Sequence, residues 1–154
     1  MVVKDGLALR GRWRVYYREP ATGREWAGGH YANVACVNGK NFLASWLNLE
    51  NPTQSRSTIY GAVGTSTVAP SSGDSGLGSE LARVVLATSS RLGNVVTLDF
   101  FFASGQGNGT LAEAGLFLGA TSGAGSGNLL SHVAISENKT SAVTMTLEFS
   151  LQIG

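Results

Sequence analysis

The sequence is short of charged residues, cysteine, proline and long apolar runs. Only 14% of its 154 residues are charged and the net charge is +1, whereas about 25% is usual in soluble domains. Nucleic-acid-binding domains need clustered Lys and Arg, so this composition argues against nucleic acid as a partner. A chain with so little charge also indicates a surface that partners cover, or one made of neutral Ser, Thr, Asn and Gly.

The remaining absences concern disulfides, membranes and export. The single cysteine, Cys36, cannot form an internal disulfide, and its apolar neighbours predict a small buried core residue. No run reaches the roughly 18 apolar residues of a membrane span. The first residues also lack the continuous apolar segment of a signal peptide. We therefore expect no membrane partner, synthesis in a cytoplasm, and a single domain, since 154 residues are too few for two ordinary ones.

The chain does contain short apolar segments separated by glycine-rich loops, which is typical of an all-β protein. Its 21 glycines include clusters at 105–109 and 119–127, as in hairpin loops. A long hairpin is predicted over residues 10–37, with the returning strand at 24–37 and a bulge or bend at Gly28-Gly29. Three arginines of the first strand alternate with other residues, as on the wet face of a strand: Arg10, Arg12 and Arg14.

One helix is predicted over residues 38–49. Asn38 is a suitable N-cap, because its side-chain oxygen accepts a backbone N–H that the helix leaves unpaired. Pro52 cannot continue a helix, so the helix ends before it. Its apolar stripe requires a sheet to cover it and consists of Phe42, Leu43, Trp46 and Leu47.

The last segment, residues 143–153, has the clearest strand pattern in the sequence. Six apolar residues from Val143 to Ile153 alternate with polar ones, which predicts one buried and one wet face. Further strands are predicted over residues 59–64, 84–87, 94–103, 110–118 and 129–135. The fold class is therefore mainly β, an antiparallel β-sandwich or jelly-roll-like domain with one short helix. Its predicted parts are an N-terminal arm (1–9), the hairpin (10–37), the helix (38–49) and a β core (58–154).

The sequence offers no constellation for catalysis. His30 and His132 have no carboxylate or cysteine at metal-ligand spacing, so each is interpreted as a sheet residue. No Gly-x-Ser-x-Gly nucleophile elbow is present. The glycine-rich segment 105–109 lacks the lysine and following helix of a phosphate loop. Residues 59–83 likewise contribute no evident nucleophile, base or metal ligand. We expect a protein that is not an enzyme and has no cofactor, metal or catalytic residue.

Three segments together resemble small structural proteins of tailed bacteriophages. The first begins Asn38-Gly-Lys-Asn-Phe-Leu. The second is residues 59–83, with the core Ala-Val-Gly-Thr-Ser-Thr-Val-Ala-Pro. The third begins Asn108-Gly-Thr-Leu-Ala-Glu-Ala-Gly-Leu-Phe, and the alternating strand closes the chain. The resemblance covers about residues 34–154 and carries over no catalytic residue.

The resemblance implies a non-enzymatic virion protein. The first expectation is a capsid decoration (cement) protein that binds and stabilises the mature shell, as a homotrimer on the major capsid protein. The alternatives are a tail-fibre or baseplate component that contacts the host surface, or a carbohydrate-binding β-sandwich module. We expect the arm to dock on a neighbouring subunit by strand addition. The candidate assembly contacts are Val2, Val3, Leu7, Leu9, Trp26 and Tyr31.

Overall fold

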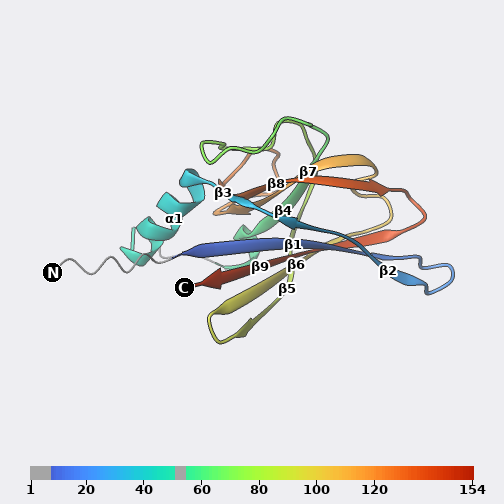
Figure 1. Ribbon diagram of the computed structural model, residues 1–154, viewed down its shortest axis with the longest axis horizontal. Helices are drawn as coiled ribbons and strands as arrows, with labels where there is room; N and C mark the ends of the chain where they lie inside the picture. The colour runs from blue at the N-terminus through green and yellow to red at the C-terminus, as the bar shows by residue number, and fades with distance from the viewer. Residues whose placement is uncertain (1–7, 51–54) are drawn as a thin grey trace.

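The computed structural model describes residues 8–50 and 55–154, which form mainly antiparallel β-sheet with one α-helix (Figure 1). In chain order the elements are β1 (Leu9–Arg18), β2 (Glu25–Ala32), β3 (Val34–Ala35), α1 (Val37–Leu47), the 3-10 turn η1 (Arg56–Thr58), β4 (Tyr60–Gly64), β5 (Glu80–Leu92), β6 (Val95–Phe102), β7 (Gly109–Leu118), β8 (Asn128–Lys139) and β9 (Thr144–Ile153). The predicted fold class, mainly β with one short helix, is confirmed. Most of the predicted arm, residues 1–7, lies outside the described residues.

The strands form two packed layers of one nearly closed sheet. Their order is β2-β1-β9-β6-β5-β4-β7-β8-β3, and every pairing is antiparallel. The first half of β5 pairs with β4 and its second half with β6, so β5 connects the layers at one edge. At the other edge the chain passes from β2, paired with β1, to β3, paired with β8. The fold is therefore a sandwich joined at both edges.

Three predicted strands differ from the observed ones, and one of them is β8, which was predicted over 129–135 and continues to Lys139. The returning strand at 24–37 is interrupted at Asn33, whose side chain occupies the space that a Cβ on Gly11 would need. There the chain leaves one layer and enters the other. The strand predicted at 84–87 instead extends over Glu80–Leu92. Its second half is polar and exposed, and backbone pairing with β6 rather than apolar burial keeps it extended.

The closing strand β9 lies in the middle of its layer. It pairs with β1 from Leu9↔Ile153 to Arg18↔Thr144, and with β6 along its other edge. Apolar side chains at the start and centre of the alternating segment are buried, whereas Leu151 is half-buried and Ile153 is exposed at the rim of the sandwich.

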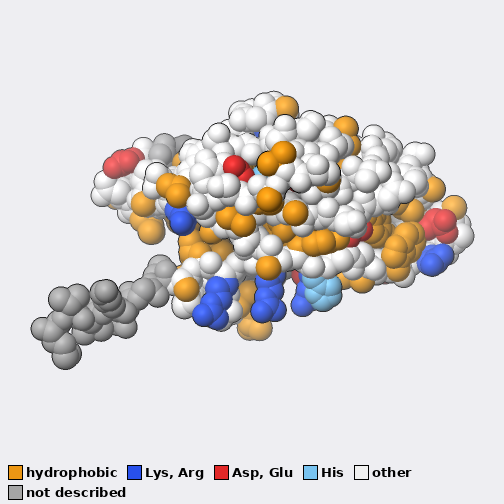
Figure 2. Space-filling model, turned by 45° about the horizontal axis from the view of Figure 1, so that its top comes forward, with side chains coloured by type: hydrophobic (Ala, Val, Ile, Leu, Met, Phe, Trp, Pro, Cys, Tyr) orange, Lys and Arg blue, Asp and Glu red, His pale blue; other side chains and the backbone are white. Residues whose placement is uncertain are grey.

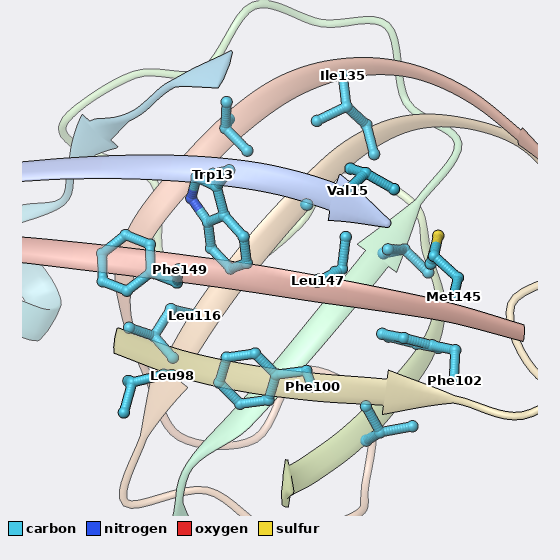
Figure 3. Packing of buried hydrophobic residues seen from close by; sticks show 14 of the residues in the cluster. Trp13, Val15, Leu98, Phe100, Phe102, Leu116, Ile135, Met145, Leu147 and Phe149 are labelled. Atoms are coloured by element: carbon cyan, nitrogen blue, oxygen red, sulfur yellow. The ribbon is translucent and has the colours of Figure 1, made fainter. Parts of the chain in front are cut away.

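The core lies between the two layers and is shown from close by in Figure 3. Trp13 and Phe149 come from one layer and face Leu116 of the other. The rings of Trp13 and Phe149 lie 4.9 Å apart. The buried indole Nε1 of Trp13 donates a hydrogen bond to Ser131 Oγ at 2.8 Å, which satisfies this N–H and connects β1 to β8.

The predicted bulge at Gly28-Gly29 is confirmed and has a structural role. Between the pairs Arg14↔His30 and Tyr16↔Ala27, two residues of β2 oppose a single residue of β1. Gly29 N–H is directed away from the ladder and donates to Glu137 Oε1 at 2.6 Å. The bulge thus provides a backbone donor for a carboxylate on β8, in the opposite layer.

Helix α1 ends two residues before its predicted limit, and its N-cap was predicted wrongly. Cys36, not Asn38, occupies the N-cap position and makes no side-chain cap hydrogen bond. The Ser72 carbonyl instead accepts the N–H of Val37 at 2.9 Å, so the loop before β5 caps the helix. Cys36 is fully buried, as predicted.

The helix packs on β8 through a glycine. A Cβ on Gly39 would clash with the backbone of Leu130, so the close approach of α1 to β8 requires glycine there. The predicted apolar stripe is only partly covered. Phe42 and Leu43 pack against the core, whereas Trp46 and Leu47 are 40% and 75% exposed.

Candidate functional site

A cluster of three ionisable side chains lies where the loop between β4 and β5 crosses β7 and β8. His132 Nδ1 lies 2.7 Å from Asp74 Oδ2, and His132 Nε2 lies 2.9 Å from Glu113 Oε2. Glu113 and His132 are buried, on the neighbouring strands β7 and β8, whereas Asp74 comes from the loop. The cluster therefore joins this loop to the sheet.

The Glu113 carboxylate is the centre of this connection. Its Oε1 accepts backbone N–H groups from Ser79 at 2.7 Å and Ser66 at 3.3 Å, and its Oε2 accepts one from Gly78 at 2.9 Å. Together with His132, four donors compensate a carboxylate that is almost fully removed from water. Both ends of the loop converge on this one side chain.

The geometry around His132 is that of a structural ion cluster. An acidic side chain faces each ring nitrogen, so both nitrogens of His132 are engaged in hydrogen bonds within the cluster. A catalytic triad instead directs the second nitrogen toward a nucleophile. The Ser71 backbone N–H, and then the hydrogen bond from His132, hold the pKa of Asp74 below its usual value. The cluster holds the loop against the sheet beside a small cavity of about 80 Å³ that Asp74, Glu113 and His132 help to line.

Two more buried charged groups connect distant segments. Arg83 pairs with Glu80, stacks over the Phe117 ring at 4.5 Å, and donates to the carbonyls of Thr121 and Ser126 at 3.1 and 3.0 Å. It thereby anchors the loop between β7 and β8.

Lys139 is almost fully buried on β8 and anchors the loop between β6 and β7. Its ammonium group donates to Ala103 O at 2.9 Å, Ser104 O at 3.3 Å and Asn108 Oδ1 at 2.8 Å. Burial lowers the pKa of Lys139. All three acceptors belong to one turn, so this lysine serves to hold the turn against β8.

Trp26 and Tyr31, two of the predicted assembly residues, belong to one cluster between the layers. Trp26 stacks on Tyr17 with ring centroids 5.6 Å apart. The hydroxyls of Tyr17 and Tyr31 donate to the Glu137 carboxylate at 2.7 and 2.8 Å. Burial, followed by the bond to Glu137, raises the pKa of Tyr17. Both predicted residues are half-buried and packed within this chain.

The other predicted assembly residues lie elsewhere or outside the structure. Leu9, half-buried, begins β1 and pairs with Ile153, at the opposite end of β1 from Trp26. Val2, Val3 and Leu7 lie outside the described residues. The structure thus brings together Trp26 and Tyr31 but not Leu9.

An apolar surface that the sequence analysis did not identify lies at the end of the molecule that carries α1. Leu49 is 79% exposed, next to the exposed Trp46 and Leu47. Beside them is an apolar groove of about 150 Å³, lined by Phe42, Leu43, Trp46, Ile59 and Leu118. We call the exposed residues and the groove together the α1 apolar surface. Figure 2 shows hydrophobic side chains at this left end, where β1 begins and β9 ends in Figure 1.

The two histidines lie on strands, as predicted. His30 is exposed on β2, and His132 is buried on β8. Within residues 8–50 and 55–154, no group of three or more His, Cys, Asp or Glu is placed to hold a metal ion. None of the helices in that same part of the chain has the length and apolar character needed to cross a membrane.

The ion cluster could not be predicted from the sequence, because its members are far apart in the chain. Asp74 and His132 are separated by 58 positions, and Asp74 belongs to a segment in which no base or ligand was recognised. One signal was present: Glu113 is the only charge in a strand of otherwise apolar or neutral residues. A buried carboxylate requires donors, and these come here from the loop and from His132.

Comparison with known proteins adds no family to this description, since no family model, curated protein or solved structure matches the chain.

Proposed function

We propose that this protein is a structural component of a tailed-bacteriophage particle, a capsid decoration protein that binds the outer surface of the mature shell. The proposal of a phage particle rests on the motifs at 38–43, 59–83 and 108–117, because they resemble those of small phage virion proteins. The observation that carries an assembly role is the α1 apolar surface. It exposes several large apolar side chains side by side in a folded domain.

The partner proposed for this surface is a second copy of the same chain, in a homotrimer. The first seven residues include Val2, Val3 and Leu7, and the chain enters β1 at the end of the molecule that carries α1 (Figure 1). We propose that this apolar segment of one subunit docks in the apolar groove of a neighbouring subunit. A trimer placed across neighbouring shell subunits would combine several weak contacts into tight binding.

The buried ion clusters support a passive structural role. Glu113, Arg83 and Lys139 each hold a loop against the sheet with their hydrogen-bonding groups directed inward. Such loops keep their shape when the particle is under mechanical load. This is what stabilisation of a shell requires, and it needs no chemical step.

The deciding measurement is the number of copies per purified particle of the phage that encodes this chain. Gel densitometry against the major shell protein should give hundreds of copies, comparable to the shell subunits. A handful of copies would assign the protein to the tail instead. Its absence from particles would refute a virion role altogether.

Light scattering after size-exclusion chromatography tests the α1 apolar surface. We expect a trimer for the wild-type chain and monomers for the double variant Leu47→Ser/Leu49→Ser, whose side chains contribute little to the core. The matched control is Phe101→Ser, which removes an exposed apolar side chain from the opposite layer. If the Leu47→Ser/Leu49→Ser protein has the same mass as wild type, this surface does not form the interface.

A further inference from the structure

The outward face of the β1-β9-β6 layer carries two adjacent rows of side chains with complementary chemistry. In the first row Tyr16 of β1 and Phe101 of β6 both pair with Thr146 of β9. In the next row, two residues along each strand, Arg14 and Asp99 both pair with Glu148. Alternate residues of a strand lie on the same face, so the aromatic row and the charged row are neighbours.

A groove of about 590 Å³ runs over these rows, and its lining includes Tyr16, Phe101, Thr146, Asp99 and Glu148. The aromatic side chains are exposed, Tyr16 by 36% and Phe101 by 48%. Two strand spacings separate them, which is about 10 Å. The small Thr146 between them leaves a hollow with an aromatic wall on each side.

The charged row combines an attractive pair, Arg14 with Glu148, and a repulsive pair, Glu148 with Asp99. Asp99 and Glu148 are direct cross-strand partners with the same charge, an arrangement that destabilises a sheet. Thr88 Oγ1 donates to Asp99 Oδ2 at 2.8 Å. Within the described part of the chain, no hydrogen bond or close ion pair engages the Glu148 carboxylate, whose charge acts on the neighbouring Arg14. Hydroxyl donors from a ligand would relieve this repulsion.

We propose that this groove binds a glycan chain of neutral pyranose sugars. The apolar C–H faces of two sugar rings stack on Tyr16 and Phe101, and the two carboxylates accept hydrogen bonds from ring hydroxyls. The adjacent carboxylates repel uronic and sialic acids, which restricts the ligand to neutral sugars.

This binding site does not depend on the proposed assembly on a shell. The groove is on the outward face of one layer, whereas α1 packs against β8 of the other layer. A protein attached through the α1 apolar surface can therefore keep this face open toward its surroundings.

The test is binding of the full-length chain to an array of neutral, amino and acidic oligosaccharides, followed by titration calorimetry with the strongest neutral ligand. We expect neutral hexose chains to bind, and acidic ones to bind much more weakly or not at all. Tyr16→Ala and Phe101→Ala should each weaken binding at least about tenfold. Glu148→Gln keeps the shape of the side chain and should also weaken binding, because the amide has only one acceptor oxygen.

Leu47→Ser/Leu49→Ser is the matched control, since it changes exposed apolar residues away from the groove and should bind the glycan as wild type does. NMR shifts upon titration should be largest for the amides of β1, β9 and β6 around Thr146. The proposal is overturned if no neutral glycan binds, or if binding survives the double variant Tyr16→Ala/Phe101→Ala with its fold intact by circular dichroism. A preference for acidic glycans would equally overturn it.

Discussion

Replacing Glu113 by glutamine should remove a large part of the stability of this fold, although the two side chains have nearly the same shape. Each carboxylate oxygen accepts two hydrogen bonds, one pair from Ser66 and Ser79 and the other from Gly78 and His132. In glutamine one of the two oxygens becomes an NH₂ group, which is itself a donor. Whichever way the amide is oriented, one pair of donors then faces another donor.

The expected loss of stability follows from the burial of the Glu113 side chain. Hydrogen bonds to a charged group contribute about 1.5–3 kcal/mol each, and breaking a buried ion pair from one side costs about 3–5 kcal/mol. The substitution loses two such bonds and leaves His132 with Asp74 as its one remaining carboxylate partner. We expect the free energy of unfolding to fall by about 3–5 kcal/mol. The melting temperature should then fall by roughly 10 °C for a chain of this size.

Urea denaturation at pH 7, followed by tryptophan fluorescence, measures the loss directly. Hydrogen exchange should locate the loss, because the amide of either Gly78 or Ser79, whichever faces the new NH₂ group, loses its acceptor and becomes much less protected. Glu148→Gln is the control: the same chemical change at a half-exposed carboxylate should alter stability by less than about 0.5 kcal/mol. If Glu113→Gln is as mild as this control, the ion cluster does not hold the loop, and the reasoning is wrong.

Three further predictions concern pH, the helix contact and the closing strand. Because the pKa of Asp74 is below its usual 3.8 in the fold, its stabilising effect is complete above that value and is lost as pH falls through the lower folded pKa. The stability difference between wild type and Asp74→Asn, measured in urea, should therefore be constant from neutral pH to about 4 and shrink below it; a difference that grows on acidification would contradict this sign. Gly39→Ala should destabilise the protein in thermal melts, because the new Cβ meets the Leu130 backbone. The destabilisation is expected even though alanine favours helices over glycine by about 1 kcal/mol. Gly123→Ala is the control, because its Cβ has room and the substitution should be neutral. A chain truncated before Val143 lacks the strand between β1 and β6 and should show no cooperative melting; a soluble truncated protein with a sharp transition would disprove this.

The features predicted correctly are those that a local pattern determines. The alternation in β1 and β9 predicts which side chains enter the core, because the two-residue period of a strand needs no knowledge of its partner. The bulge at Gly28-Gly29 is likewise predicted from neighbouring residues of one strand, without knowledge of the partner strand. The N-cap of α1 is different: the carbonyl of Ser72, 35 positions from Val37, takes the place of the side chain of Asn38. A contact made by the tertiary fold thus replaced the local signal.

The candidate sites could not be predicted, because one depends on strand register and the other on how far the sheet covers α1. Asp99 and Glu148 become neighbours only when β6 pairs with β9. Exposure of Trp46 and Leu47 depends on where the sheet stops covering α1. A helical apolar stripe is normally interpreted as buried, and the sequence does not reveal how far the covering layer extends.

The few charged side chains of this chain occupy distinct places in the fold. A set of ionisable side chains is directed inward to hold loops: Glu80, Arg83, Glu113, His132 and Lys139. Several of the others lie on the outward face of β1-β9-β6, which includes the arginines of β1 and the Asp99–Glu148 pair. The α1 end is left apolar. Since these two surfaces belong to opposite layers, a substitution in one should leave the function of the other intact. Loss of both functions from a single surface variant would mean that the two layers do not act independently.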